Sequence, residues 1–301
     1  MTQTKATKTR KLDQTIIDRL LAQLSQTKEG KALVDFARHR KVKFVREYDQ
    51  VNTGFWRHRD NTLFLNKALT REEALVSLSH ELRHAWQTHS VKNLARATDR
   101  NMLKTKFKKA VVMLRAMEAD AYSYQLSATI DLCKKGIIRQ RPEKAFMTME
   151  ETPELRNFVK GFIKKHAHQP FSAAARKESF LFFQTSTLFY HSYDDGIYAG
   201  MGANVTRRKL GEEDLDYASI MGFPTLGAVF NTFGQSKISD PKIKYMQTSD
   251  RHDVTRFTLQ NLHPSVKKII NRTNKRLYDL HRNVERKGYD FKKLERMIKT
   301  A

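Results

Sequence analysis

The sequence TREEALVSLSHELRHAWQTH, residues 70–89, decides how the rest of the chain is interpreted. Thr70 followed three residues later by Glu73 is a capping box, in which the two side chains satisfy free N–H groups at the start of a helix. Apolar residues then recur at three- and four-residue spacing along one side. The segment is therefore predicted to be an amphipathic helix that opens at Thr70 and runs to about His89.

Two histidines lie on the opposite side of this predicted helix. Residues four apart are one turn apart on the same face, so His80 and His84 can bind one metal ion through their imidazoles. Glu81 lies about 100° around the helix from His80, where it can take a proton from a metal-activated water without being a ligand. The alternative is chance, which would place this pattern in a chain with 11 histidines roughly a few percent of the time.

The segment before this helix is predicted to form a small sheet. Residues 42–48, 54–58 and 62–66 are rich in β-branched and aromatic side chains, and residues 59–61 form a turn before the third strand. We therefore expect an α+β fold that is mainly helical. Helical periodicity predicts further helices at residues 13–24 (with Asp13 as the cap), 30–39, 111–134 (closed by Gly136), 153–165, 173–190 and 264–301.

A third metal ligand is predicted on helix 111–134. A catalytic zinc typically has three protein ligands and one open position. Glu118 shares its helix face with a mostly apolar stripe, where a lone carboxylate would cost several kcal/mol unless it were paired or coordinated. The alternative for Glu118 is an ion pair with Arg115 or another arginine. Asp120 points away from this face and is the weaker ligand candidate.

These two motifs resemble those of a known group of enzymes. The pattern HExxH at residues 80–84, followed by ExxA at residues 118–121, resembles the gluzincin branch of zinc metallopeptidases. More narrowly, it resembles uncharacterised bacterial metallopeptidase families that keep only a minimal zincin-like core. Residues 54–56 and 62–66 are similar to the edge strand beside the substrate cleft of those families. The resemblance covers roughly residues 40–135.

The resemblance implies a zinc-dependent peptidase. One Zn²⁺ per chain would be held by His80, His84 and Glu118, and Glu81 would be the general base that activates water against a peptide bond. Protein or peptide substrates are expected. The motifs assign no group that stabilises the transition state. Tyr190, His191 and Tyr193 are candidates because they can donate to an oxyanion, or they simply end a buried helix.

The charge of the chain suggests a competing class of function. Lys and Arg number 56 against 32 Asp and Glu, a net charge of +24, and basic residues concentrate in residues 92–115 and 264–301. Such segments can contact nucleic acid or an anionic surface nonspecifically, steer an acidic protein substrate, or simply be solvated. The alternative hypotheses are a nucleic-acid-associated binding protein with a structural or degenerate metal site, and a toxin-like effector that cleaves one host protein.

The chain is expected to have three parts. Residues 1–12 would be a mobile basic tail, residues 13–200 a zincin-like metallopeptidase domain, and residues 201–301 a loop-rich segment followed by basic helices. No apolar run is long enough to span a bilayer, no Sec-type signal is visible, and Cys133 is the single cysteine. We expect a cytoplasmic protein, with secretion as an effector without a Sec signal as the alternative.

Overall fold

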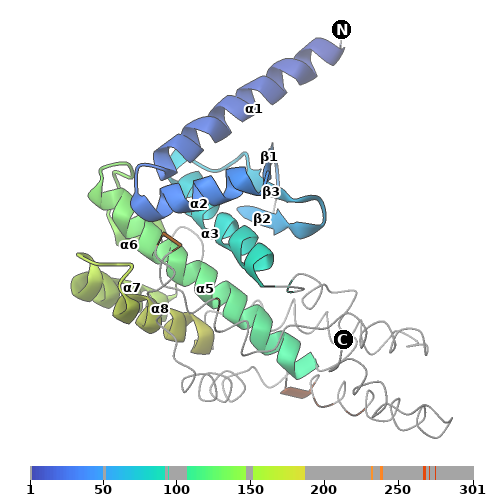
Figure 1. Ribbon diagram of the computed structural model, residues 1–301. Coiled ribbons are helices and arrows are strands. Elements are labelled where there is room, and N and C mark those ends of the chain that lie inside the picture. The colour runs from blue at the N-terminus through green and yellow to red at the C-terminus, as the bar shows by residue number, and fades with distance from the viewer. Residues whose placement is uncertain are drawn as a thin grey trace, which may run out of the picture. The chain divides into compact units, whose positions relative to one another are not determined.

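The computed structural model describes residues 2–49, 52–91, 94, 107–146 and 152–186, together with residues 232, 238, 239, 267, 268, 271 and 275. The described chain is mainly helical with one small sheet, which confirms the predicted α+β class (Figure 1). The chain divides into two compact units, of which the first comprises Met1–Ser90, Met117–Phe183 and Thr232–Gln247, and the second the remaining residues. The sheet and the site described below belong to the first unit.

The sheet has three strands in the order β1-β3-β2. β1 (Lys43–Glu47) is parallel to β3 (Thr62–Asn66), and β2 (Gly54–Arg57) is antiparallel to it. The central strand β3 is buried over its first four residues. Asn61 ends the β2–β3 connection with a φ of 56°, a left-handed conformation that Asn tolerates better than most residues. The three predicted strands and the turn are confirmed.

Helix α3 (Arg71–Ser90) is the helix predicted from residues 70–89. The Thr70 backbone N–H donates to Glu73 Oε2 at 2.8 Å, and the Glu73 N–H donates back to Thr70 Oγ1 at 3.4 Å, so the capping box is formed. α3 packs against β2, β3 and α2. Its residues are buried on every side from Ala74 to Thr88, including the side that carries the histidines.

The N-terminal helix α1 (Thr2–Leu24) begins before the predicted start at residue 13. Residues 2–12 contain no Pro or Gly that would end a helix, and the mobility of residues 1–12 stays a prediction. Asp13 does not cap the helix. Its carboxylate forms ion pairs with Lys67 Nζ at 2.7 Å and Arg46 Nη1 at 3.6 Å, which tie α1 to the sheet region. α2 spans Lys28–His39 and is capped by Thr27.

The described residues after α3 include four further helices, α5 (Phe107–Lys134), α6 (Pro142–Phe146), α7 (Pro153–His166) and α8 (Ala173–Thr185). Gly136, with a φ of +69°, follows α5 as predicted. α7 and α8 meet through aromatic rings, and Phe158 stacks on Phe182 with ring centroids 3.7 Å apart. α6 was not predicted. No helix among these residues is long and apolar enough to cross a membrane.

Candidate metal centre

Three side chains from two helices converge in the first unit. His80 and His84 on α3 face each other with their Nε2 atoms 3.0 Å apart. Glu118 on α5 places Oε2 3.4 Å from each of these nitrogens. In a tetrahedral site with metal–ligand bonds of about 2.0–2.1 Å, ligand atoms lie roughly 3.3 Å from one another. The three atoms therefore fit one metal ion, and no other such cluster of His, Cys, Asp or Glu occurs among the residues that the structure describes.

The electrostatics of this cluster also fit a cation. Glu118 Oε2 is buried and has no hydrogen-bond partner within the described part of the chain. Burial raises the pKa of Glu118, but His84 and His80 together hold it far below its ordinary value. Burial lowers the pKa of His84, but the Glu118 carboxylate outweighs burial and raises it to about 9. The three groups therefore favour a positive charge between them. A divalent cation can supply that charge in place of the proton on His84.

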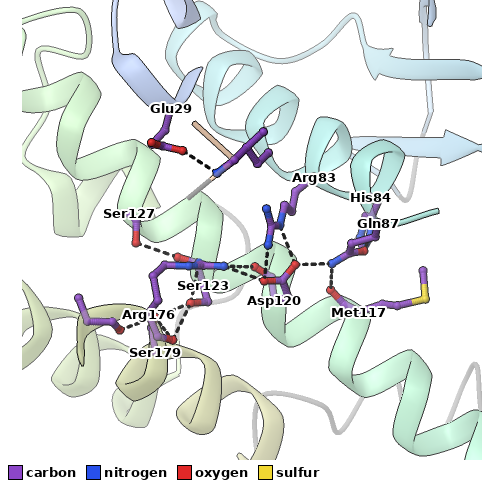
Figure 2. Close-up of polar contacts among 12 residues, drawn as sticks. Glu29, Arg83, His84, Gln87, Met117, Asp120, Ser123, Ser127, Arg176 and Ser179 are labelled. Atoms are coloured by element: carbon purple, nitrogen blue, oxygen red, sulfur yellow. Dashed lines mark hydrogen bonds and ion pairs between the residues drawn. The ribbon is translucent and has the colours of Figure 1, made fainter. Parts of the chain in front are cut away.

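The weaker ligand candidate, Asp120, has a different role. Its carboxylate accepts hydrogen bonds from Arg83 Nε at 2.7 Å and from Arg176 Nη2 at 2.7 Å, and all three side chains are fully buried (Figure 2). Burial raises the pKa of Asp120, but these two arginines outweigh it and keep the carboxyl ionised. Arg115, the arginine named as the alternative partner of Glu118, donates to the Gln184 carbonyl at 3.4 Å. The ion pairs of Glu118 in the described part of the chain are to the two histidines.

Glu81 lies beside the cluster and next to the edge strand. It is buried, and a methyl group built on Gly54 of β2 would lie 3.1 Å from its Cγ. Burial raises the pKa of Glu81 above its ordinary value, although the two histidines and the Trp56 backbone N–H act in the opposite direction. Glu81 is thus a buried acidic group that interacts electrostatically with His80, His84 and Glu118.

A family model described as "Putative metallopeptidase family (DUF6782)" matches residues 1–187. The chain belongs to this family. The matched segment contains the candidate metal-binding cluster, Glu81 and the whole sheet, and it ends two residues after α8. No curated protein and no solved structure matches the chain.

The cluster of His80, His84 and Glu118 has neighbours that were not predicted from the sequence. Gln125 Oε1 lies 2.9 Å from His80 Nδ1, and Gln87 Oε1 lies 2.8 Å from His84 Nδ1. Glutamine is common on helices, so neither residue carries a signal in the sequence that could have found it. Tyr122 packs its ring edge-on against His80, with centroids 4.4 Å apart. It follows Glu118 by one helical turn on α5.

Other predicted residues lie elsewhere. Tyr190, His191 and Tyr193 are outside the described residues, as are residues 201–231 and most of the two basic segments. Cys133 donates its thiol to the Gln140 carbonyl, and burial raises its pKa to about 12. A thiol in that state is a poor nucleophile.

Proposed function

We propose that this member of the metallopeptidase family is a zinc-dependent peptidase, with His80, His84 and Glu118 as the zinc ligands and Glu81 as the general base. The observation that carries the proposal is the convergence of two imidazole Nε2 atoms and one carboxylate oxygen at 3.0–3.4 Å from two different helices. Two His and one Glu form a donor set typical of catalytic zinc, in which a fourth position stays open for water or substrate.

The proposed chemistry divides between the ion and the chain. Zinc, when bound by these residues, supplies Lewis acidity that polarises the peptide carbonyl and makes water a stronger acid. Glu81 would accept a proton from the attacking water and pass it to the leaving amine. Gly54 leaves the space beside its Cγ open, since a methyl group on that residue would lie 3.1 Å from it.

Strand β2 supports a polypeptide as substrate. Within the described residues, β3 is the strand partner of β2, so β2 lies at an edge of the sheet. An extended peptide can add to such an edge through main-chain hydrogen bonds. Gly54 begins β2 and contacts Glu81, so a segment paired with β2 would pass beside the general base. We infer an extended protein segment as the substrate class.

The competing hypotheses receive no comparable support. The basic segments that would contact nucleic acid lie mostly outside the described residues, and no observation favours such a contact. The idea of an effector with one protein target uses the same chemistry and stays a prediction, as does the cytoplasmic location.

Chelation tests the proposal. A catalytic site should lose hydrolysis of an unfolded protein such as casein when zinc is removed, regain it when zinc is restored, and keep its circular dichroism throughout. Hydrolysis that persists in fully zinc-free protein would contradict the proposal. Unfolding on chelation would instead assign the metal a structural role.

A further inference from the structure

We propose that Gln87, held in place by the buried carboxylate of Asp120, positions His84 for metal binding. Neither Gln87 nor Asp120 is among the proposed ligands, yet both would determine how tightly zinc binds. The inference rests on the proposed metal site, because it concerns the orientation of one of its ligands.

The hydrogen bonds of Gln87 fix the orientation of its side-chain amide. Gln87 Nε2 donates to the Met117 carbonyl at 2.8 Å and to Asp120 Oδ2 at 2.8 Å. A carbonyl and an ionised carboxylate can only accept, so the amide nitrogen must face them and cannot exchange places with the oxygen. Gln87 Oε1 is then left to face His84 Nδ1 at 2.8 Å.

The orientation of this amide determines the tautomer of His84. An amide oxygen can only accept a hydrogen bond, so His84 Nδ1 must carry the hydrogen. In the neutral imidazole the lone pair is then on Nε2, the atom that faces His80 and Glu118. Gln87 thus selects the form of His84 that can bind a metal through Nε2 and fixes the plane of its ring.

Asp120 is itself held rigidly. Arg83 donates to both of its oxygens, through Nε at 2.7 Å and Nη2 at 2.9 Å, and Arg176 Nη2 donates to Oδ1 at 2.7 Å. Figure 2 shows the resulting series of contacts from Arg176 through Asp120 to Gln87, with His84 beside it. Charge-assisted bonds between fully buried groups leave the carboxylate one position. The ionic cluster therefore acts as the anchor of Gln87.

The neutral amide also matters for the charge of the site. Metal-binding histidines often donate to a carboxylate, which makes the imidazole a more basic ligand. Here both histidines face glutamine oxygens instead, Gln125 at His80 and Gln87 at His84. Of Glu118, Glu81 and the two glutamines, only the two glutamates can then bring a negative charge close to the ion. A dication bound there would keep more of its Lewis acidity than one whose histidines donate to carboxylates.

The first test compares the zinc affinities of variants at two buried polar residues, Gln87 and Ser127. Gln87→Met keeps the length of the side chain but cannot accept from His84, so the zinc dissociation constant should rise by about 10–100-fold, the effect usual for such supporting residues. Zinc affinity is measured by competition with a chromophoric chelator. Ser127→Ala is the control, because Ser127 is buried on α5 and donates to the Pro170 carbonyl at 2.8 Å without any bond to Gln87 or Asp120.

The control should bind zinc as tightly as wild type. Equal zinc affinity in Gln87→Met and wild type would overturn the positioning role, and so would an equal loss in both variants, which would point to general destabilisation. If wild type itself binds no zinc, the proposed function fails rather than this inference.

A change of charge provides the second test and does not depend on Gln87→Met folding. Gln87→Glu places a second carboxylate where Gln87 now donates to Asp120 Oδ2 at 2.8 Å, so the side chain should leave its position beside His84. The zinc dissociation constant should then rise by about 10–100-fold. Zinc affinity equal to that of wild type in a folded Gln87→Glu variant would contradict the proposed link between Asp120 and His84.

Discussion

The α-carbon of Gly54 on the edge strand faces the side chain of Glu81 so closely that a methyl group there would lie 3.1 Å from Glu81 Cγ. The same methyl group would lie 2.9 Å from the Phe64 carbonyl oxygen and 2.9 Å from Ser77 Oγ. Side-chain carbons almost never approach other atoms this closely. The glycine therefore lets the edge strand and the helix that carries Glu81 approach each other.

Replacing this glycine should disturb both fold and activity. In Gly54→Ala the strand must move away from the Phe64 carbonyl or from α3, at a cost of about 1–3 kcal/mol in the free energy of unfolding, as for other overpacked sites. Displacement of Glu81 should also lower kcat/KM on any protein that the wild type cleaves. Gly161→Ala is the matched control, since it lies in α7 with no atom within 4 Å of the added methyl. It should stabilise the chain by roughly 0.5–1 kcal/mol and leave activity unchanged.

The third ligand is tested by Glu118→Gln. The neutral amide is a poor ligand for a divalent cation. The raised pKa of His84 also depends on the Glu118 carboxylate. Zinc affinity should fall markedly. Glu178→Gln is the control, because Glu178 also pairs with a histidine, His166 at 3.0 Å, but lies outside the cluster. Full zinc occupancy in Glu118→Gln would move the third ligand elsewhere.

Acid should remove the stabilisation that Asp120 provides. The arginines hold its pKa in the folded chain below the unfolded value of about 3.9, so its contribution is complete above that pH and is lost as the pH falls toward the folded pKa. Asp120→Asn should therefore be less stable than wild type by about 3 kcal/mol or more at pH 7, with the difference shrinking below pH 4. Urea unfolding of both proteins with a chelator present measures it. A difference that grows as the pH falls would contradict the ionised state of Asp120.

Local signals in the sequence predicted most of the fold around the site. The Thr70–Glu73 capping box located the start of α3, and the spacing of His80 and His84 placed both rings on one side. Both of these inferences use residues within one or two helical turns, where spacing determines position. For Glu118, the cost of burying an unpaired carboxylate indicated only that it needs a partner, and the structure places its Oε2 3.4 Å from His84 Nε2.

Contacts between distant segments could not be predicted in the same way. Asp13 was predicted to cap a helix from its place in the sequence. Its ion-pair partners, Arg46 and Lys67, come from the sheet region, and no local sequence pattern indicates these contacts. Gln87 and Asp120 are also ordinary helix residues until packing of α3 on α5 brings them to 2.8 Å. Local propensity gives no information on such pairings, because they depend on how whole helices pack.

The role of Glu81 separates catalysis from metal binding. Glu81→Gln keeps the shape of the side chain and removes the base, so zinc should stay bound while hydrolysis falls by about 10²–10⁴-fold. The comparison should use a protein that the wild type cleaves, including the chain itself if it cleaves no other. Wild-type hydrolysis by a zinc-loaded Glu81→Gln would exclude Glu81 as the base. Loss of zinc would mean that Glu81 supports the metal, and that His80, His84 and Glu118 are not sufficient to hold it.

The zinc content of the purified 301-residue chain tests the central claim most directly. Elemental analysis after dialysis against metal-free buffer should give about one zinc per chain, bound by the two imidazoles and one carboxylate of the cluster. The double variant His80→Ala/His84→Ala, prepared in parallel, should retain none. A wild-type chain that is folded by circular dichroism but holds no zinc, even after incubation with excess zinc, would contradict the account.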